Sequence, residues 1–84
     1  MVQVKVLGPG CARCKKLFHE AERAIAEAGV EAELTKVDDF EAIMAYGVAM
    51  TPALVMDDEV VSVGRIPRAD KIAAWLAKAA SGQG

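Results

Sequence analysis

Two cysteines separated by two residues, Cys11 and Cys14, are the side chains of this 84-residue chain best suited to chemistry. They lie between residues 2–7, which alternate apolar and polar side chains, and a segment of helical periodicity that begins near Ala12. A thiol attacks a disulfide, or binds a soft metal, only as its thiolate, so its pKa decides what it can do. The first turn of a helix has unpaired N–H donors and a partial positive charge, and both stabilise an anion there.

Three basic residues lie beside the cysteines, and the first acidic residue of the chain is Glu20. Their positive charges favour a thiolate at Cys11, because an opposite charge nearby lowers the pKa of a thiol. The predicted thiolate-stabilising residues are Arg13, Lys15 and Lys16.

The two cysteines are predicted to differ in exposure. At about 100° per residue, one apolar stripe of the helix begins at the second cysteine and faces the core. This stripe comprises Cys14, Leu17, Phe18, Ala21, Ile25 and Ala28. Cys11 falls at the cap position, outside the stripe and next to a Gly-Pro-Gly turn. An exposed acidic thiol beside a sheltered one suits thiol–disulfide exchange, in which Cys11 attacks the substrate and Cys14 resolves the mixed disulfide.

Other uses of the cysteine pair are possible on chemical grounds. A purely structural disulfide contributes little here, because a loop of so few residues hardly restricts the unfolded chain. In a reducing compartment a CxxC pair is more often catalytic or metal-binding than structural. Two thiolates on one loop suit Cu(I) or Zn. A soft-metal carrier is therefore the second function class to consider, and a non-catalytic interaction module is the third.

The rest of the chain offers few further metal ligands. There is no third cysteine, and the only histidine, His19, falls on the polar face of the first helix. A closed four-ligand zinc site within one chain is therefore not expected. The Gly-x-x-Cys-x-x-Cys opening is similar to that of heavy-metal-associated domains, but those end on a strand, whereas this chain ends on a helical pattern containing Ile72 and Leu76. We expect no metal and no cofactor apart from the redox-active disulfide Cys11–Cys14.

Length and composition restrict the broad class. With 84 residues, 54% of them hydrophobic and 26% charged, the chain suits one small domain over residues 1–80, followed by a flexible tail at 81–84. A net charge of −2 argues against nucleic acid or an anionic membrane as a partner. The first residues do not resemble a signal peptide, and no apolar run reaches membrane-spanning length. We therefore expect a cytoplasmic monomer.

The elements that position the cysteines follow from the rest of the pattern. The first helix is predicted to stop at Gly29, which suits a left-handed C′ residue, and a strand pattern resumes over residues 31–37. Asp38 and Glu41 resemble a capping box that opens a short helix through Phe40, Ile43 and Met44, ending at Gly47.

The last part of the chain predicts a hairpin and a helix. Two apolar runs, 53–56 and 60–63, are separated by acidic residues, of which Asp58 tolerates a left-handed turn. A final helix begins near Pro67 and places Ala69, Ile72, Trp75, Leu76 and Ala79 on one side. The order is β-α-β-α-β-β-α. A βαβ start requires a right-handed crossover between parallel strands, and the hairpin adds an antiparallel pair. The expected fold is α/β, with a four-stranded mixed sheet flanked by helices.

One residue fits this sheet poorly. Lys5 lies in a strand expected to be central, where both faces are normally apolar. We expect the short second helix to leave that face partly open, so that the lysine reaches water with its amine.

This order of elements, with the CxxC motif opening the first helix and Thr51-Pro52 just before the third strand, resembles the thioredoxin fold over residues 2–80. More narrowly, three segments are similar to small prokaryotic glutaredoxin-like proteins called redox-active disulfide proteins. The segments are Gly8-Pro9-Gly10-Cys11-Ala12-Arg13-Cys14, Thr51-Pro52 and Val63-Gly64-Arg65. The resemblance implies a dithiol–disulfide oxidoreductase that acts on protein disulfides and is reduced by a reductase yet to be identified.

The same resemblance implies a role for the loop around Pro52. It implies that the Thr51–Pro52 bond is cis and that this loop faces the two cysteines. In the family, the backbone of the residue before the proline pairs with an extended substrate, a form of strand addition. That role is implied for Thr51, and Met50 is expected to supply apolar contact beside the disulfide.

The chain departs from two well-known branches of the fold. Thioredoxins proper usually have Trp before the first cysteine and Gly-Pro between the two, whereas here Gly10 precedes and Ala12-Arg13 intervenes. Glutaredoxins that use glutathione usually have two glycines before the last helix, whereas here one glycine is followed by Arg65. These departures weaken the expectation of glutathione or the usual thioredoxin reductase as partners, although Arg65 or Lys16 could meet a carboxylate of glutathione.

Overall fold

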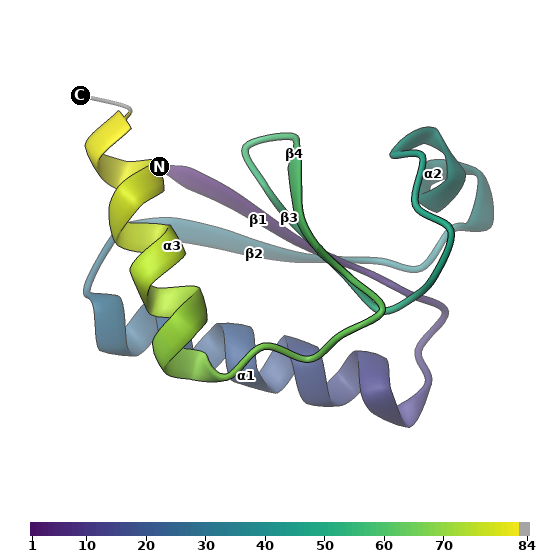
Figure 1. Cartoon of the computed structure of the whole chain (residues 1–84), viewed down its shortest axis with the longest axis horizontal. Coiled ribbons are helices and arrows are strands. Elements are labelled where there is room, and N and C mark those ends of the chain that lie inside the picture. Colours follow the sequence, from purple (N-terminus) through teal and green to yellow (C-terminus); the bar gives the residue numbers. More distant parts are fainter. Residues whose placement is uncertain (83–84) are drawn as a thin grey trace.

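The computed structural model describes residues 1–82 and has the predicted order of elements (Figure 1). The elements are β1 (Val2–Leu7), α1 (Ala12–Ala28), β2 (Ala32–Val37), α2 (Phe40–Ala45), β3 (Ala53–Met56), β4 (Glu59–Val63) and α3 (Ala69–Gly82). The strands form one sheet in the order β2-β1-β3-β4. β1 pairs in parallel with β2 and antiparallel with β3, which pairs antiparallel with β4. The expected α/β fold with a mixed four-stranded sheet is confirmed.

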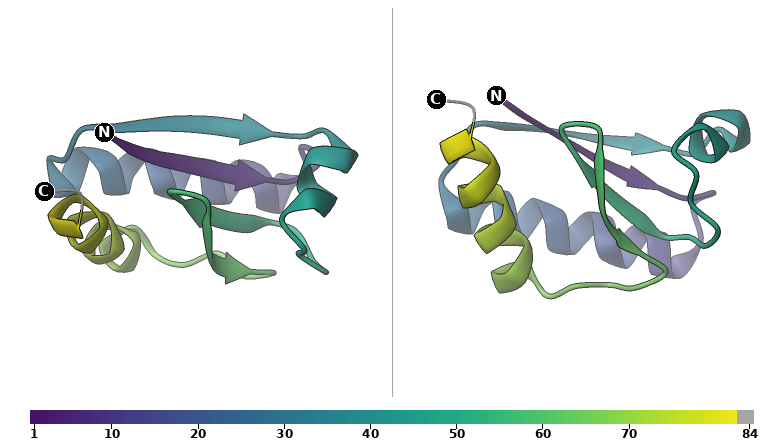
Figure 2. Two further views of the ribbon diagram at one scale, coloured as in Figure 1. Left: turned by 90° about the horizontal axis from the view of Figure 1, so that it is seen from above. Right: turned by 45° about the horizontal axis from the view of Figure 1, so that its top comes forward.

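Both long helices lie on the same face of the sheet, and α2 lies at one end of it (Figures 1 and 2). Alternate residues of β1, namely Val2, Val4 and Val6, are buried in this layer together with Leu17 of α1 and Leu76 of α3. Each such side chain contributes roughly 1.5–3 kcal/mol through the removal of apolar surface from water. The main core therefore fixes α1, and with it the cysteines, against the central strand.

The predicted apolar stripe of α1 is largely confirmed. Cys14, Leu17 and Ala21 are buried, as expected, and Ala24 is buried as well, although the pattern did not include it. The helix ends as predicted, with Gly29 in the left-handed conformation at φ 65° and its N–H donating to the carbonyl of Ile25.

The opposite face of the sheet is covered only in part. A small cluster of Leu7, Ile43, Val48, Ala53 and Val55 packs beneath α2 at one end. Beyond it, Lys5 is half-buried and donates from Nζ to the Tyr46 hydroxyl at 2.9 Å. The predicted partly open face is thus confirmed, and the hydrogen bond to Tyr46 raises the pKa of Lys5.

The predicted boundaries of α2 and α3 differ from the structure. The N-cap of α2 is Asp39, which accepts from the N–H of Ala42 at 3.1 Å, so the assignment to the neighbouring Asp38 is wrong by one residue. The last helix begins at Ala69. Its C-terminal turn includes Ser81 and Gly82, which the sequence predicted to be part of the flexible tail. This turn is held because Ala79 and Ala80 favour helix and pack against the core. The remainder of the predicted tail, residues 83–84, lies outside the described residues.

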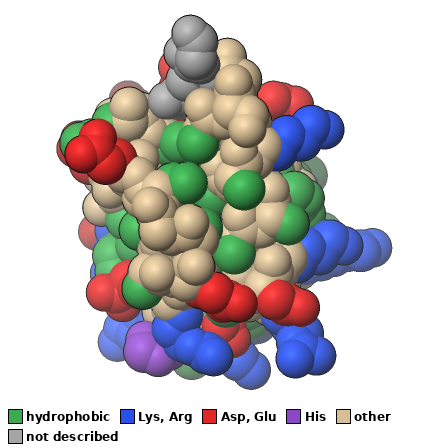
Figure 3. All heavy atoms as spheres, turned by 90° about the vertical axis from the view of Figure 1, so that its left-hand side faces the viewer, with side chains coloured by type: hydrophobic (Ala, Val, Ile, Leu, Met, Phe, Trp, Pro, Cys, Tyr) green, Lys and Arg blue, Asp and Glu red, His purple; other side chains and the backbone are tan. Residues whose placement is uncertain are grey.

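The surface carries charges of both signs. On the face seen in Figure 3, apolar side chains lie in the middle, and acidic and basic side chains surround them. None of the helices within residues 1–82 is long and apolar enough to cross a membrane.

Candidate active site

The two cysteines meet at the start of α1. Cys11 is the N-cap residue and is exposed, whereas Cys14, in the first turn, is only 2% exposed. Both thiols are free, and the two Sγ atoms are 2.8 Å apart in a hydrogen-bonded contact. The predicted difference in exposure is confirmed. An accessible sulfur therefore lies in direct contact with a sheltered one.

The loop before α1 allows the sheltered cysteine to pack closely. Gly8 follows the end of β1, and its N–H donates to the carbonyl of Val37 at the end of β2. A Cβ on Gly8 would collide with Cys14 Sγ, so only glycine leaves room for the buried thiol. Gly10, with φ 94°, then turns the chain into the helix.

The surroundings of the two thiols shift their pKa values in opposite directions. The pKa of Cys11 is lowered, first by the hydrogen bond with the Cys14 thiol and then by the backbone N–H groups of Cys14 and Arg13. The pKa of Cys14 is raised, first by burial and then by the hydrogen bond with Cys11. Cys11 consequently ionises first as the pH rises, with the Cys14 S–H donating to its thiolate.

Of the three basic residues near the cysteines, Arg13 has a side-chain hydrogen bond to a group other than the thiolate. The Arg13 guanidinium donates to the carbonyl of Gly64 at 2.9 Å. Arg13 lowers the pKa of Cys11 through its backbone N–H instead. Lys15 lines a small cavity of about 190 Å³ beside Cys14, and Lys16 is exposed. Thiolate stabilisation by the lysine side chains stays a prediction.

The Thr51–Pro52 loop lies beside the cysteines. Its peptide bond is cis, as the resemblance implied, and Pro52 is buried. A Cβ built on Gly8, which would collide with Cys14, would also lie 3.9 Å from the Cβ of Thr51. Gly8 therefore lies between the Thr51–Pro52 loop and the buried thiol of Cys14. Met50 is 59% exposed. The structure therefore brings Thr51 close to the loop that carries the cysteines, and the roles of Met50, Thr51 and Pro52 in substrate binding stay predictions.

An apolar groove adjoins this site. It has a volume of about 250 Å³ and is bordered by Pro9, Phe40, Met44, Met50 and Thr51. Phe40 is 72% exposed and Met44 54% exposed. The groove therefore presents exposed apolar side chains next to the loop that carries the cysteines. Sequence reasoning did not place Phe40 or Met44 in the site. Their i, i+3 and i+4 spacing with Ile43 puts all three on one side of the helix, so the sequence offered no signal that only Ile43 of α2 is buried.

A further residue near the site was also missed. Lys36 of β2 lines the cavity beside Cys14, and its Nζ is 3.8 Å from where a Cβ of Gly10 would lie. The parallel register pairs Lys36 with Val6, so the end of β2 reaches the loop that carries the cysteines. The βαβ geometry was the signal that could have found it.

The described residues offer little for a metal. Within residues 1–82, no group of three or more His, Cys, Asp or Glu side chains could hold a metal ion. His19 is exposed and lies 3.8 Å from Glu22 on the surface of α1.

Comparison with known proteins identifies the family. A family model described as "Thioredoxin domain" matches residues 2–77. A thioredoxin of Methanocaldococcus jannaschii is 35% identical over 72 residues, covering 86% of this chain and 83% of the relative. A thioredoxin of Methanothermobacter thermautotrophicus is 32% identical over 72 residues, covering 86% of this chain and 94% of the relative. This chain belongs to the thioredoxin family and is a thiol–disulfide oxidoreductase.

Proposed function

We propose that the protein exchanges the Cys11–Cys14 pair with disulfides of other proteins. The observation that supports this most directly is the pair itself, an exposed thiol of lowered pKa whose Sγ lies 2.8 Å from that of a buried thiol. Exchange needs both an attacking thiolate and a second sulfur within bonding reach. Cys11 and Cys14 are the groups that would take these two parts.

The proposed reaction has two steps. In the first, the Cys11 thiolate attacks one sulfur of a substrate disulfide, which forms a mixed disulfide and releases the other substrate sulfur as a thiolate. In the second, Cys14 loses its proton to the released thiolate and attacks Cys11 Sγ. The mixed disulfide breaks, and the second substrate thiolate leaves. The substrate gains two electrons, and the protein holds a Cys11–Cys14 disulfide with no other cofactor.

The groove beside the cysteines suits a polypeptide substrate. Phe40, Met44 and Met50 offer apolar surface to side chains that flank the substrate disulfide. We expect the backbone of Thr51 to pair with an extended segment of the substrate, the role that the family resemblance implies. A reductase that recognises the same face would return the protein to its dithiol form.

Turnover with a protein disulfide tests this proposal. The reduced protein is mixed with a disulfide-bonded protein. Free cysteines are then alkylated, and the masses of both proteins are measured by mass spectrometry. We expect one substrate disulfide to be lost for each Cys11–Cys14 disulfide formed, and the Cys11→Ser variant to produce none. Failure of the wild type to reduce any protein disulfide, together with a tight one-to-one Cu(I) complex that survives glutathione, would favour a metal carrier instead.

A further inference from the structure

A second groove lies between β4 and the start of α3, and we call it the basic groove. It has a volume of about 470 Å³, and its lining residues include Arg65, Arg68, Lys71 and Trp75. The three cationic side chains are exposed, and none of the lining residues is acidic. Asp70 lies nearby, 3.8 Å from Arg68 Nε, but both side chains are largely exposed and such a pair binds weakly.

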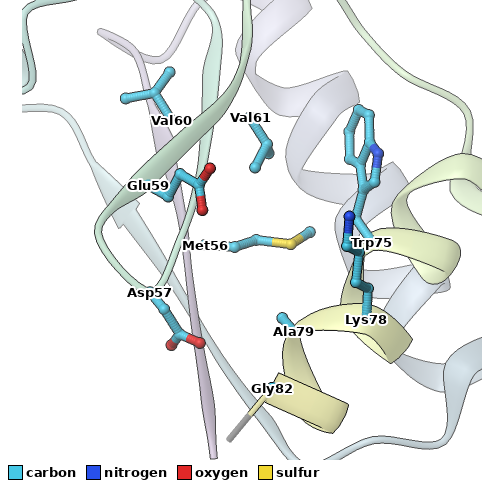
Figure 4. Close-up of a pocket in the computed structure, with 9 residues that line it drawn as sticks. All are labelled: Met56, Asp57, Glu59, Val60, Val61, Trp75, Lys78, Ala79 and Gly82. Atoms are coloured by element: carbon cyan, nitrogen blue, oxygen red, sulfur yellow. The ribbon is translucent and has the colours of Figure 1, made fainter.

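The groove has an apolar wall as well as cations. Trp75 is half-buried, and the Lys71 Nζ lies 5.7 Å from the centre of its ring. Trp75 and Val61 line the basic groove and also a neighbouring hollow of about 610 Å³. Figure 4 shows this hollow, with Val61 and Met56 pointing toward Trp75 on α3.

The two hollows differ in charge. The hollow in Figure 4 is lined by Asp57 and Glu59 as well as Lys78, whereas the basic groove has cations alone. The tryptophan ring thus separates a surface of mixed charge from a surface of positive charge. A ligand that carries several carboxylates would distinguish the two.

The basic groove is connected to the cysteine site through Gly64. The carbonyl of Gly64 accepts from Arg13, next to Cys11, and its N–H donates to the carbonyl of Pro52 at 2.8 Å. A Cβ on Gly64 would lie 3.3 Å from Met50. Arg65, the first cation of the groove, is the next residue along the chain. A polypeptide with its disulfide at Cys11 therefore needs only a short extension to reach the groove.

We propose that the basic groove binds an acidic segment of the protein that exchanges disulfides with Cys11. This inference rests on the proposed function. Carboxylates of the segment pair with Arg65, Arg68 and Lys71, and an apolar side chain of the segment packs on Trp75. The chain has a net charge of −2, so an acidic partner is repelled by the molecule as a whole and is oriented by this local positive surface. A protein segment is the expected occupant rather than nucleic acid, because the partner must carry the disulfide that reacts with Cys11.

Binding is tested with Trp75 as the reporter, since it is the only tryptophan in the chain. A Cys11→Ser/Cys14→Ser protein is titrated with an unstructured peptide containing several glutamates and one leucine. We expect a saturable change in fluorescence, with affinity reduced about tenfold by an Arg65→Gln/Arg68→Gln double substitution or by 0.5 M salt. Lys78→Gln, which removes one charge on the other side of Trp75, should leave the affinity unchanged. Equal binding of a lysine peptide, or tighter binding of a single-stranded oligonucleotide, would overturn the assignment.

Kinetics separates this inference from the proposed function. Two disulfide-linked peptides are compared that differ only in carrying Glu or Gln on the side that would face Arg65. We expect the Glu peptide to have the higher kcat/KM at low salt, and the preference to disappear in the Arg65→Gln/Arg68→Gln variant while the rate with the Gln peptide stays unchanged. If both peptides react equally in the wild type, the basic groove is not a docking site and the exchange function stands. If neither reacts, the proposed function fails.

Discussion

At the scale of single residues, the chemistry of the site depends on which of two neighbouring thiols keeps its proton. Cys11 is exposed and, as a thiolate, accepts hydrogen bonds at the start of a helix, whereas Cys14 is buried and donates to that thiolate. Burial disfavours a thiolate and hydrogen bonds favour it, so the same contact assigns the attacking role to one sulfur and the resolving role to the other.

The cause of the lowered pKa of Cys11 can be tested by mutation. Removing the thiol donor in Cys14→Ala should raise the pKa of Cys11, because that hydrogen bond is the largest cause of its lowering. The rate of iodoacetamide labelling at Cys11, followed against pH, should then reach its midpoint at a higher pH than in the wild type. Lys16→Gln serves as the control and should shift the midpoint less. A larger shift in Lys16→Gln would restore the lysine side chain as the main stabiliser.

Gly8 is a second residue whose identity is dictated by contact. In Gly8→Ala the new Cβ must displace Cys14 Sγ, and overpacking of this kind costs about 1–3 kcal/mol of unfolding free energy. Urea denaturation of the reduced protein measures the cost. It should be smaller in a Cys14→Ala background, where the displaced sulfur is absent. Gly82→Ala, at a position with open space around it, should not destabilise the protein.

At the scale of elements, α2 has an unusual role for so short a helix. Only Ile43 of its six residues is buried, and the helix is further held at its C-cap, where Tyr46 accepts from Lys5 of β1. Its outer surface presents Phe40 and Met44 to the groove. The helix therefore contributes more to the surface beside the cysteines than to the core.

This view of α2 predicts a separation of activity from stability. Phe40→Ser should lower kcat/KM for a protein disulfide severalfold while changing the free energy of unfolding by no more than about 0.5 kcal/mol, because the ring is 72% exposed. The rate with a small acyclic disulfide such as bis(2-hydroxyethyl) disulfide should stay the same, since it needs no groove. A parallel loss with both substrates would place Phe40 outside substrate binding.

At the scale of the whole molecule, the periodic and local features were predictable from sequence. Val2, Val4 and Val6 alternate along a strand, and the helix after the cysteines ends at a glycine that adopts the expected left-handed conformation. Such features depend on neighbours in the chain. The cap of α2 was misplaced because Asp38 and Asp39 are chemically equivalent and only the folded backbone distinguishes them.

Individual side-chain contacts between distant segments, which neither the pattern nor the family resemblance specifies, could not be predicted from the sequence. Arg13 is hydrogen-bonded to Gly64, 51 residues away, and local charge patterning gave it a different partner. The groove joins Phe40 to Pro9 and Met50, which lie in separate loops and elements. Propensity and periodicity predict the helices and strands and the apolar side of each. The order of the strands in the sheet decides which of these apolar residues come into contact.

The central claim is that Cys11 attacks and Cys14 resolves, and trapping of the mixed disulfide tests it most directly. Cys14→Ser and Cys11→Ser proteins are each incubated with a disulfide-bonded protein, quenched with acid and analysed by mass spectrometry without reductant. The account predicts that Cys14→Ser accumulates a covalent adduct through Cys11 that dithiothreitol releases, because no third cysteine exists to resolve it. Cys11→Ser should accumulate almost none, since its remaining thiol is buried and has a raised pKa. Equal trapping by the two variants, or normal turnover by Cys14→Ser, would contradict the account.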